Sequence, residues 1–156
     1  MPTHDILVSI DPAFARRVQA EWLTGIARIA LEQEKVGDCQ VSVAVVDDAQ
    51  VLTLNRQYAN DDHVTDVLSF SQEEGEAFVS PPDEPRRLGD VIISFETAER
   101  QAAAAGHDTD AELAHLLAHG ILHLLGYDHA KAEEEAVMRE KEREVLSKAG
   151  VRAHHP

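Results

Sequence analysis

The sequence predicts an α/β fold of the α+β-like kind, in which a small mixed β-sheet of about four strands is covered by helices. Short apolar runs typical of strands come mostly early in the chain, and longer helical segments come late. The chain has 156 residues, is 44% hydrophobic and contains only six prolines and eight glycines, a composition typical of a globular domain. We therefore expect one domain over residues 1–156, with residues 150–156 as a frayed tail.

The first predicted strand and helix follow one another directly. The run DILVSI predicts a strand over residues 5–10. The segment 10–34 then predicts a helix, with Asp11 as its N-cap and Pro12 at the first helical position, where proline is favoured.

A second strand and helix are predicted over residues 39–58. Small residues alternate with Val41, Val43 and Val45, a pattern that favours a strand. Either Asp47 or Asp48 can cap the helix that follows, which we expect to reach about Tyr58.

Two further strands and three helices complete the predicted fold. The strands cover residues 65–70 and 88–95, and the segment between them is rich in proline, glycine and charge, which predicts a loop. The helices are expected over residues 96–106, 108–126 and 132–150.

Charge and cysteine content limit the partners and the compartment. The net charge of −15 disfavours contact with a polyanion except where Lys and Arg are clustered. The single cysteine, Cys39, cannot form an intramolecular disulfide, and the N-terminal residues lack a signal peptide pattern. No apolar run is long enough to span a bilayer. We expect a cytoplasmic protein that binds neither membranes nor DNA.

Four polar side chains form one stripe on the predicted helix 108–126, which is otherwise apolar on every side. They are Glu112, His115, His119 and His123. His119 and His123 lie one turn apart and point in the same direction, so one metal ion can bridge them. Buried imidazoles hydrogen-bonded to backbone carbonyls are the alternative, but a shared cation would satisfy several buried polar groups at once.

Gly126 follows the last leucine of this helix, where glycine can adopt the left-handed conformation that turns the chain back. His129 can then reach the same ion. The pattern HxxxHxxGxxH matches in spacing the three-histidine zinc sites of metzincin proteases. We predict one Zn²⁺ bound by His119, His123 and His129, with nickel, copper and iron as the alternatives that imidazole ligands also bind. We expect His115 and Glu112 to support these ligands from the second coordination shell.

One difference from the protease pattern bears on mechanism. Metzincins carry HExxH and use the glutamate as general base, whereas Gly120 follows His119 here. Peptide hydrolysis is therefore disfavoured, and water activation would depend on the metal with help from another group. Asp128 is a candidate for that proton-transfer role, although a plain turn aspartate explains it equally well.

The segment HGILHLLGYDH resembles the signature HGxLHLxGYDH of the YbeY family of rRNA maturation endoribonucleases at every fixed position. The resemblance extends to YANDDHVTDVLSF and to LGDVIIS with the following AERQA. It implies an α/β fold with a small mixed sheet, and His119, His123 and His129 as the metal ligands.

Two positions depart from the family pattern. Many members carry Arg where this chain has Ala59, and Pro where it has Val64. Arg56 lies one helical turn before Ala59, so its guanidinium is a candidate to neutralise a phosphate oxygen in place of the family arginine.

The resemblance implies a zinc-dependent endoribonuclease that acts in ribosomal RNA maturation, including processing of the 3′ end of 16S rRNA, and in ribosome quality control. Its expected partners are ribosomal RNA and components of the small ribosomal subunit, with an assembly GTPase as a further candidate. The alternatives are a ribosome-assembly factor whose metal is structural or regulatory and which has no nuclease activity, and a metal-dependent hydrolase of another substrate.

Overall fold

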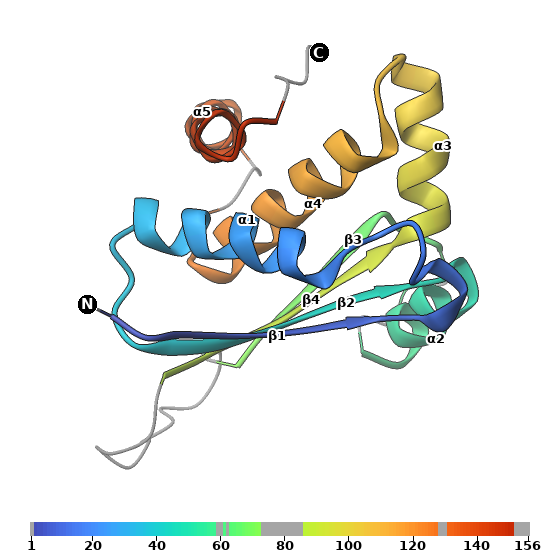
Figure 1. Ribbon diagram of the computed structural model, residues 1–156, viewed down its shortest axis with the longest axis horizontal. Helices are drawn as coiled ribbons and strands as arrows, with labels where there is room; N and C mark the ends of the chain where they lie inside the picture. The colour runs from blue at the N-terminus through green and yellow to red at the C-terminus, as the bar shows by residue number, and fades with distance from the viewer. Residues whose placement is uncertain (1, 59–60, 62, 73–85, 128–130, 152–156) are drawn as a thin grey trace.

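A computed structural model describes residues 2–58, 61, 63–72, 86–127 and 131–151. Its centre is one four-stranded sheet (Figure 1), with strands β1 His4–Ile10, β2 Cys39–Val46, β3 Val67–Ser71 and β4 Arg86–Ser94. The strand order is β1-β2-β4-β3. β1 and β4 pair with β2 in parallel, and β3 pairs with β4 in antiparallel. The predicted mixed sheet is confirmed.

Most helices cover one face of this sheet. They are α1 Ala20–Gln33, α3 Phe95–Ala105, α4 Thr109–Leu124 and α5 Ala132–Lys148, and α2 Asp48–Tyr58 lies on the opposite side (Figure 1). α4 is central because it packs against α1, α3, α5 and the strands β3 and β4. Among the described residues, no helix has the length and apolar character needed to cross a bilayer. Of the predicted tail, Gly150 and Val151 are described, and Val151 packs against the core.

The prediction of one continuous helix over residues 10–34 is wrong. Asp11 caps only a short 3₁₀ turn, Pro12–Phe14, and α1 begins later, at Ala20. Residues 14–17 pack against the start of α3. The Phe14 ring stacks on the Phe95 ring with 4.6 Å between their centroids, and the guanidinium of Arg17 lies over the Phe95 ring. Packing against a distant segment therefore overrides the local helix signal.

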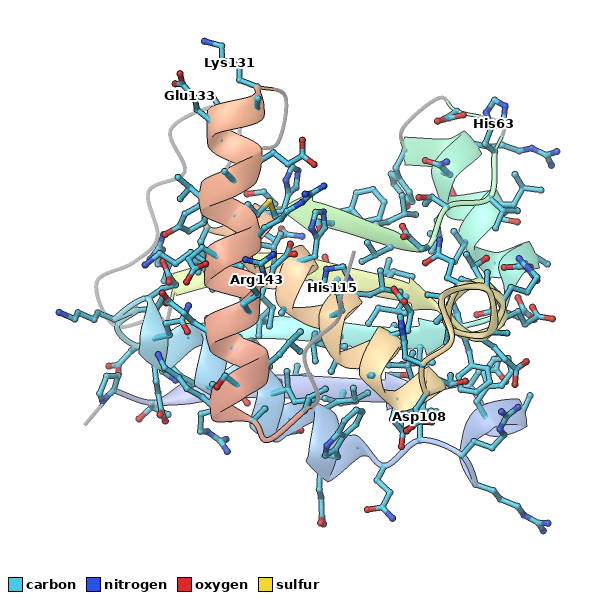
Figure 2. The ribbon with its side chains drawn as sticks, turned by 90° about the horizontal axis from the view of Figure 1, so that it is seen from above. His63, Asp108, His115, Lys131, Glu133 and Arg143 are labelled. Carbon is cyan, nitrogen blue, oxygen red and sulfur yellow. The ribbon has the colours of Figure 1, made fainter. Side chains whose placement is uncertain are left out.

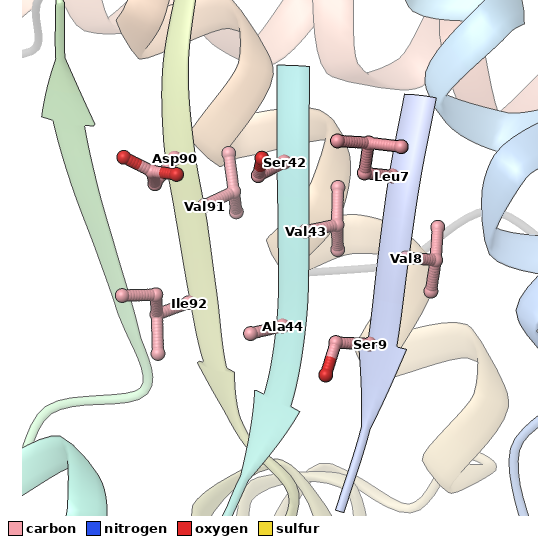
Figure 3. Close-up of a pocket in the computed structure, with 9 residues that line it drawn as sticks. All are labelled: Leu7, Val8, Ser9, Ser42, Val43, Ala44, Asp90, Val91 and Ile92. Atoms are coloured by element: carbon pink, nitrogen blue, oxygen red, sulfur yellow. The ribbon is translucent and has the colours of Figure 1, made fainter. Parts of the chain in front are cut away.

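Figure 3 shows the face of the sheet that lies away from α1 and α4. A pocket of about 240 Å³ lies among nine residues of β1, β2 and β4. Leu7 of β1 is 49% exposed there, whereas Val43 of β2 and Val91 of β4 are buried. Along β2, buried residues alternate with partly exposed ones. This alternation shows that the apolar core, and the histidines of α4, belong to the other side of the sheet.

Asp48 joins three elements at the carboxyl ends of β2 and β4. Its Oδ1 accepts hydrogen bonds from the hydroxyls of Ser94 at 2.5 Å and Thr97 at 2.7 Å, and its Oδ2 accepts one from Arg100 at 2.9 Å. Burial opposes ionisation, but these three donors outweigh it and lower the pKa of Asp48 below its ordinary value of 3.8. The ionised carboxylate therefore stabilises the junction of α2 with β4 and α3.

Replacing Asp48 with alanine is expected to lower the free energy of unfolding by about 2 kcal/mol at neutral pH, because hydrogen bonds to a charged group are lost. Since folding lowers this pKa, the contribution is complete above pH 3.8 and disappears as the pH falls through the folded-state value. Urea unfolding at pH 7 and pH 3 should show a smaller gap between wild type and variant at pH 3 than at pH 7. An equal gap at both values would contradict this account.

Candidate metal centre

α4 carries two of the three predicted ligands, and its apolar residues hold it in the core. Leu113, Leu117 and Ile121 are fully buried in the core. The polar stripe lies where α5 crosses α4, and Figure 2 shows His115 on α4 beside α5. The side chain of His119 is 27% exposed, so it contacts both protein and solvent. The stripe is therefore accessible enough to bind a ligand.

Glu142 of α5 bridges two of the α4 histidines. Its Oε1 lies 2.9 Å from Nε2 of His115, and its Oε2 lies 2.7 Å from Nδ1 of His119. Glu142 is only 5% exposed. Burial would raise the pKa of this carboxyl, but its bonds to the two imidazoles outweigh burial and lower the pKa to about 2. Glu142 is therefore an ionised carboxylate within the protein.

Glu112 provides a second buried carboxylate on the same stripe. It lies 2.8 Å from Nε2 of His107 and 3.6 Å from Nδ1 of His115. Burial would lower the pKa of His115, but Glu112 and Glu142 outweigh burial and raise the pKa to about 9. His115 is thus a cation held between two carboxylates. His115 therefore contacts the same carboxylate as His119, and Glu112 lies next to His115.

The donor set of His119 fits a metal ligand. Its Nδ1 is engaged by a carboxylate, the arrangement by which metal-binding histidines are oriented to bind through Nε2. His123 lies one turn further along α4, and its Nδ1 is buried. Among the described residues, no three His, Cys, Asp or Glu side chains form a complete metal site. The third predicted ligand, His129, and the candidate Asp128 lie outside the described residues.

The turn after α4 is built as the glycine pattern predicts. Gly126 has a φ of +102°. Its N–H donates to the carbonyl of His123 at 3.0 Å, and the N–H of Tyr127 donates to the carbonyl of Leu122 at 3.1 Å. These two bonds form a Schellman motif. The chain therefore leaves the helix at Gly126, shortly after His123.

Replacing Gly126 with valine is expected to destabilise the turn by about 1 to 2 kcal/mol, because a β-branched residue is strained at positive φ. Open space surrounds the position, so the cost comes from the backbone and not from a clash. Asparagine, which tolerates positive φ, is the matched control and should lose much less. Thermal melting measures the stability of each variant, and zinc titration measures its metal affinity. A valine variant with the melting temperature and zinc affinity of wild type would mean that the turn can relax.

Gly120 has a packing role that the sequence did not reveal. A Cβ at this position would lie 2.6 Å from Cγ1 of Val91 and 3.3 Å from Oγ of Ser69. Ser69 also donates to the carbonyl of Gly120 at 3.3 Å. α4 therefore needs glycine to approach β3 and β4, and the position occupied by glutamate in the proteases faces the sheet here.

Arg56 lies apart from this stripe. It is an exposed residue in the last turn of α2, and α2 packs against β4 and α3 on the side of the sheet away from α4 (Figure 1). Ala59 lies outside the described residues. Asp66 has a local role in capping β3, because its carboxylate accepts from the N–H of Val67 at 2.8 Å.

Sequence reasoning missed Glu142 and His107. α5 buries Met138, Glu142, Val145 and Leu146, so Glu142 occupies a position on the apolar stripe of an otherwise charged helix. An acidic residue at such a position is a signal that could have identified it. His107 follows Gly106, the glycine that ends α3, and its partner Glu112 lies in the first turn of α4. The spacing of these two residues in the sequence does not indicate that they are in contact.

Comparison with known proteins gives one consistent result. Residues 9–150 match the family described as Endoribonuclease YbeY. An Endoribonuclease YbeY of Roseiflexus castenholzii is 41% identical over 155 residues, which is 97% of this chain and 98% of that protein. An Endoribonuclease YbeY of Pelotomaculum thermopropionicum is 50% identical over 127 residues, 81% of this chain and 83% of that protein.

A solution structure from Thermotoga maritima shares the fold. It has a TM-score of 0.60 at 24% identity, and the match covers 92% of this chain and 90% of that one. The prediction of an endoribonuclease, a hydrolase of phosphodiester bonds, is confirmed by the family match. With its mixed sheet, its α4 histidines and its similarity to these relatives, this chain belongs to the endoribonuclease YbeY family.

Proposed function

We propose that this protein is a zinc-dependent endoribonuclease that acts on ribosomal RNA during maturation, including the 3′ end of 16S rRNA, and in ribosome quality control. His119, His123 and His129 hold one Zn²⁺. The observation that carries the proposal is the contact of 2.7 Å between Nδ1 of His119 and the buried carboxylate of Glu142. Metal-binding histidines that coordinate through Nε2 are oriented by a contact of this kind.

Each described residue has a separate task in this proposal. Glu142 fixes the ring orientation of His119, and it is itself held by protonated His115. Glu112 in turn holds His115. When bound, the metal supplies a Lewis acid and lowers the pKa of a coordinated water. Gly120 leaves no carboxylate beside His119, so Asp128 is our candidate for moving the proton.

The acidic surface shapes the choice of partner. A net charge of −15 weakens binding to naked RNA. Recognition therefore depends on local basic groups and on components of the small ribosomal subunit, with an assembly GTPase as a further candidate. The lone cysteine, Cys39, is buried, which suits a reducing cytoplasm, where we place the protein.

Replacing Glu142 with glutamine tests the metal centre. We expect zinc affinity and RNA cleavage to fall by about 10- to 100-fold, because the carboxylate that orients His119 is lost. Glu144→Gln is the matched control, since Glu144 lies on the same helix and its side chain is 40% exposed. Zinc content, cleavage of a ribosomal RNA fragment and circular dichroism should be measured together.

Metal removal separates the enzyme from the assembly factor. Loss of cleavage with the fold retained supports the enzyme, whereas collapse of the fold in a protein that never cleaves RNA supports a factor with a structural metal. Cleavage of a different substrate class would support the remaining alternative. Glu142→Gln with wild-type zinc affinity would overturn the role given to Glu142.

Arg56 is proposed to neutralise a phosphate of the bound RNA in place of the arginine absent at Ala59. Arg56→Ala is expected to lower cleavage by about tenfold, while Glu73→Ala and Glu74→Ala leave it nearly unchanged. Glu73 and Glu74 lie outside the described residues. A silent Arg56→Ala would reject this role and leave the metal centre intact.

A further inference from the structure

A polar pocket lies on the far side of the α4 turn, outside the histidine stripe. Its volume is about 460 Å³. The C-terminal end of α1, the start of β4 and the turn after α4 all contribute to it, through Glu34, Lys35, Val36, Gly37, Arg86, Leu125, Gly126 and Tyr127. The pocket therefore shares its wall with the turn that leads from His123 to His129.

Two basic side chains line this pocket from separate elements. Lys35 follows α1, Arg86 begins β4, and both are exposed. Among the described residues, the Lys35 ammonium makes no ion pair, whereas Arg17, Arg100 and Arg139 each pair with a carboxylate. On a chain with 29 acidic residues and 14 basic ones, two bases that face one pocket form a local site of the kind a polyanion needs.

The backbone conformation of Lys35 is unusual for a residue other than glycine. Its φ is +56°, the only positive value of a non-glycine residue in the described part of the chain. Its position resembles that of Gly126, because the following residue, Val36, donates to the carbonyl of Leu31 at 3.0 Å and closes α1. Glycine would fit this position without strain. The backbone conformation of the turn does not require a lysine, so Lys35→Gly removes the charge without straining the turn.

The carboxylate in the pocket is already satisfied. Glu34 accepts from the hydroxyl of Tyr127 at 2.5 Å and from Nε2 of Gln33 at 3.1 Å, and Nζ of Lys141 lies 3.9 Å away. Its side chain is only 11% exposed. Glu34 therefore acts as an anchor for Tyr127 and is largely shielded from solvent.

Tyr127 stands between this pocket and a second one. The second pocket, of about 420 Å³, is lined by Gly126, Tyr127, Glu133, Glu134 and Val137. The hydrogen bond to Glu34 fixes the ring from one end. A fixed aromatic ring beside basic groups is the combination that binds single-stranded nucleic acids, through base stacking and backbone contacts.

We propose that this pocket binds one nucleotide of single-stranded RNA next to the cleavage site, with its phosphate between Lys35 and Arg86 and its base against Tyr127. This inference rests on the proposed endoribonuclease function. It also gives the path of the bound strand, which runs from the α4 histidines across the Gly126 turn. It places two basic contacts at the end of α1 and the start of β4, beside the turn that follows α4.

The test is the salt dependence of RNA binding by the zinc-loaded protein. Fluorescence anisotropy with a short single-stranded RNA, read before cleavage proceeds, should show about fivefold weaker binding for Lys35→Gln and for Arg86→Gln. Each variant should also lower the slope of log affinity against log salt by about 0.7, the value for one phosphate contact on a single strand. Arg28→Gln is the matched control, because Arg28 is an exposed base on α1 outside the pocket.

Three further variants separate binding from structure. Lys35→Gly should bind RNA as weakly as Lys35→Gln while melting no lower than wild type. Tyr127→Leu should weaken RNA binding about tenfold through lost stacking, and Tyr127→Phe should retain most of the affinity because it keeps the ring.

Wild-type affinity and slope in both Lys35→Gln and Arg86→Gln would overturn the subsite, as would an equal loss in Arg28→Gln. Competition by inorganic phosphate that depends on Lys35, with unchanged RNA affinity, would also overturn it and identify an anion pocket instead. If the variants lose RNA affinity as expected but wild type cleaves no RNA, the proposed function fails and the subsite stands. If wild type cleaves RNA and the variants bind normally, the reverse holds.

Discussion

Replacing His119 with alanine is expected to remove bound zinc and to abolish RNA cleavage, and the loss should exceed the roughly 10- to 100-fold expected when only an orienting partner is removed. Glu142 of α5 contacts the Nδ1 atom of His119 at 2.7 Å. Removing the His119 side chain therefore deletes a proposed ligand and leaves a buried carboxylate with one imidazole partner fewer. Elemental analysis of the purified variant, together with cleavage of a ribosomal RNA fragment, measures both losses.

The other proposed ligands should respond in the same way. His123→Ala and His129→Ala are each expected to reduce zinc occupancy severely. His107→Ala is the matched control, because His107 contacts Glu112 at the far end of the charged network and is not a proposed ligand. Stoichiometric zinc in any of the three ligand variants would contradict the ligand set, and loss of zinc only in His107→Ala would move the site along the helix.

Replacing Gly120 with glutamate, which would recreate the protease sequence HExxH, is expected to unfold the protein rather than create a peptidase. The new Cβ would lie 2.6 Å from Cγ1 of buried Val91. Even Gly120→Ala should cost about 1 to 3 kcal/mol, because an overpacked core must shift. Glutamate adds the larger penalty of a charge directed at the apolar side of the sheet. Urea unfolding and thermal melting give the magnitudes.

A double-mutant cycle identifies the cause. Val91→Ala removes the two methyl groups that the added Cβ would meet. Gly120→Ala combined with Val91→Ala should therefore be less destabilised than the sum of the single variants, by at least about 0.5 kcal/mol. Strict additivity would show that Gly120 is required for a reason other than its approach to β4.

The sequence predicted α4 and its turn well because their signals are local. The apolar positions around α4 and the glycine after Leu125 specify a buried helix and a Schellman reversal within one short segment. The order of strands and helices was similarly sufficient for the mixed sheet. These elements need no information about distant partners.

The failures share a different cause. The helix predicted from Asp11 breaks because Phe14 stacks on Phe95, a residue far along the chain. Glu142 was missed because its role depends on α5 crossing α4, which no spacing within α5 encodes. Gly120 was read as the absence of a catalytic base, whereas its role is contact with Val91. Each depends on tertiary contacts that local patterns do not contain.

The position of Glu142 on α5 has a consequence for how activity is lost. α5 packs against α4 and α1 and buries only four of its 17 residues, so it is a candidate for a cooperative unit that detaches before the sheet unfolds. Any such opening carries Glu142 away from His119 while the core remains folded. Amide hydrogen exchange in α5 should therefore report the fraction of inactive molecules, and mild denaturant should abolish cleavage at concentrations that leave the strands protected.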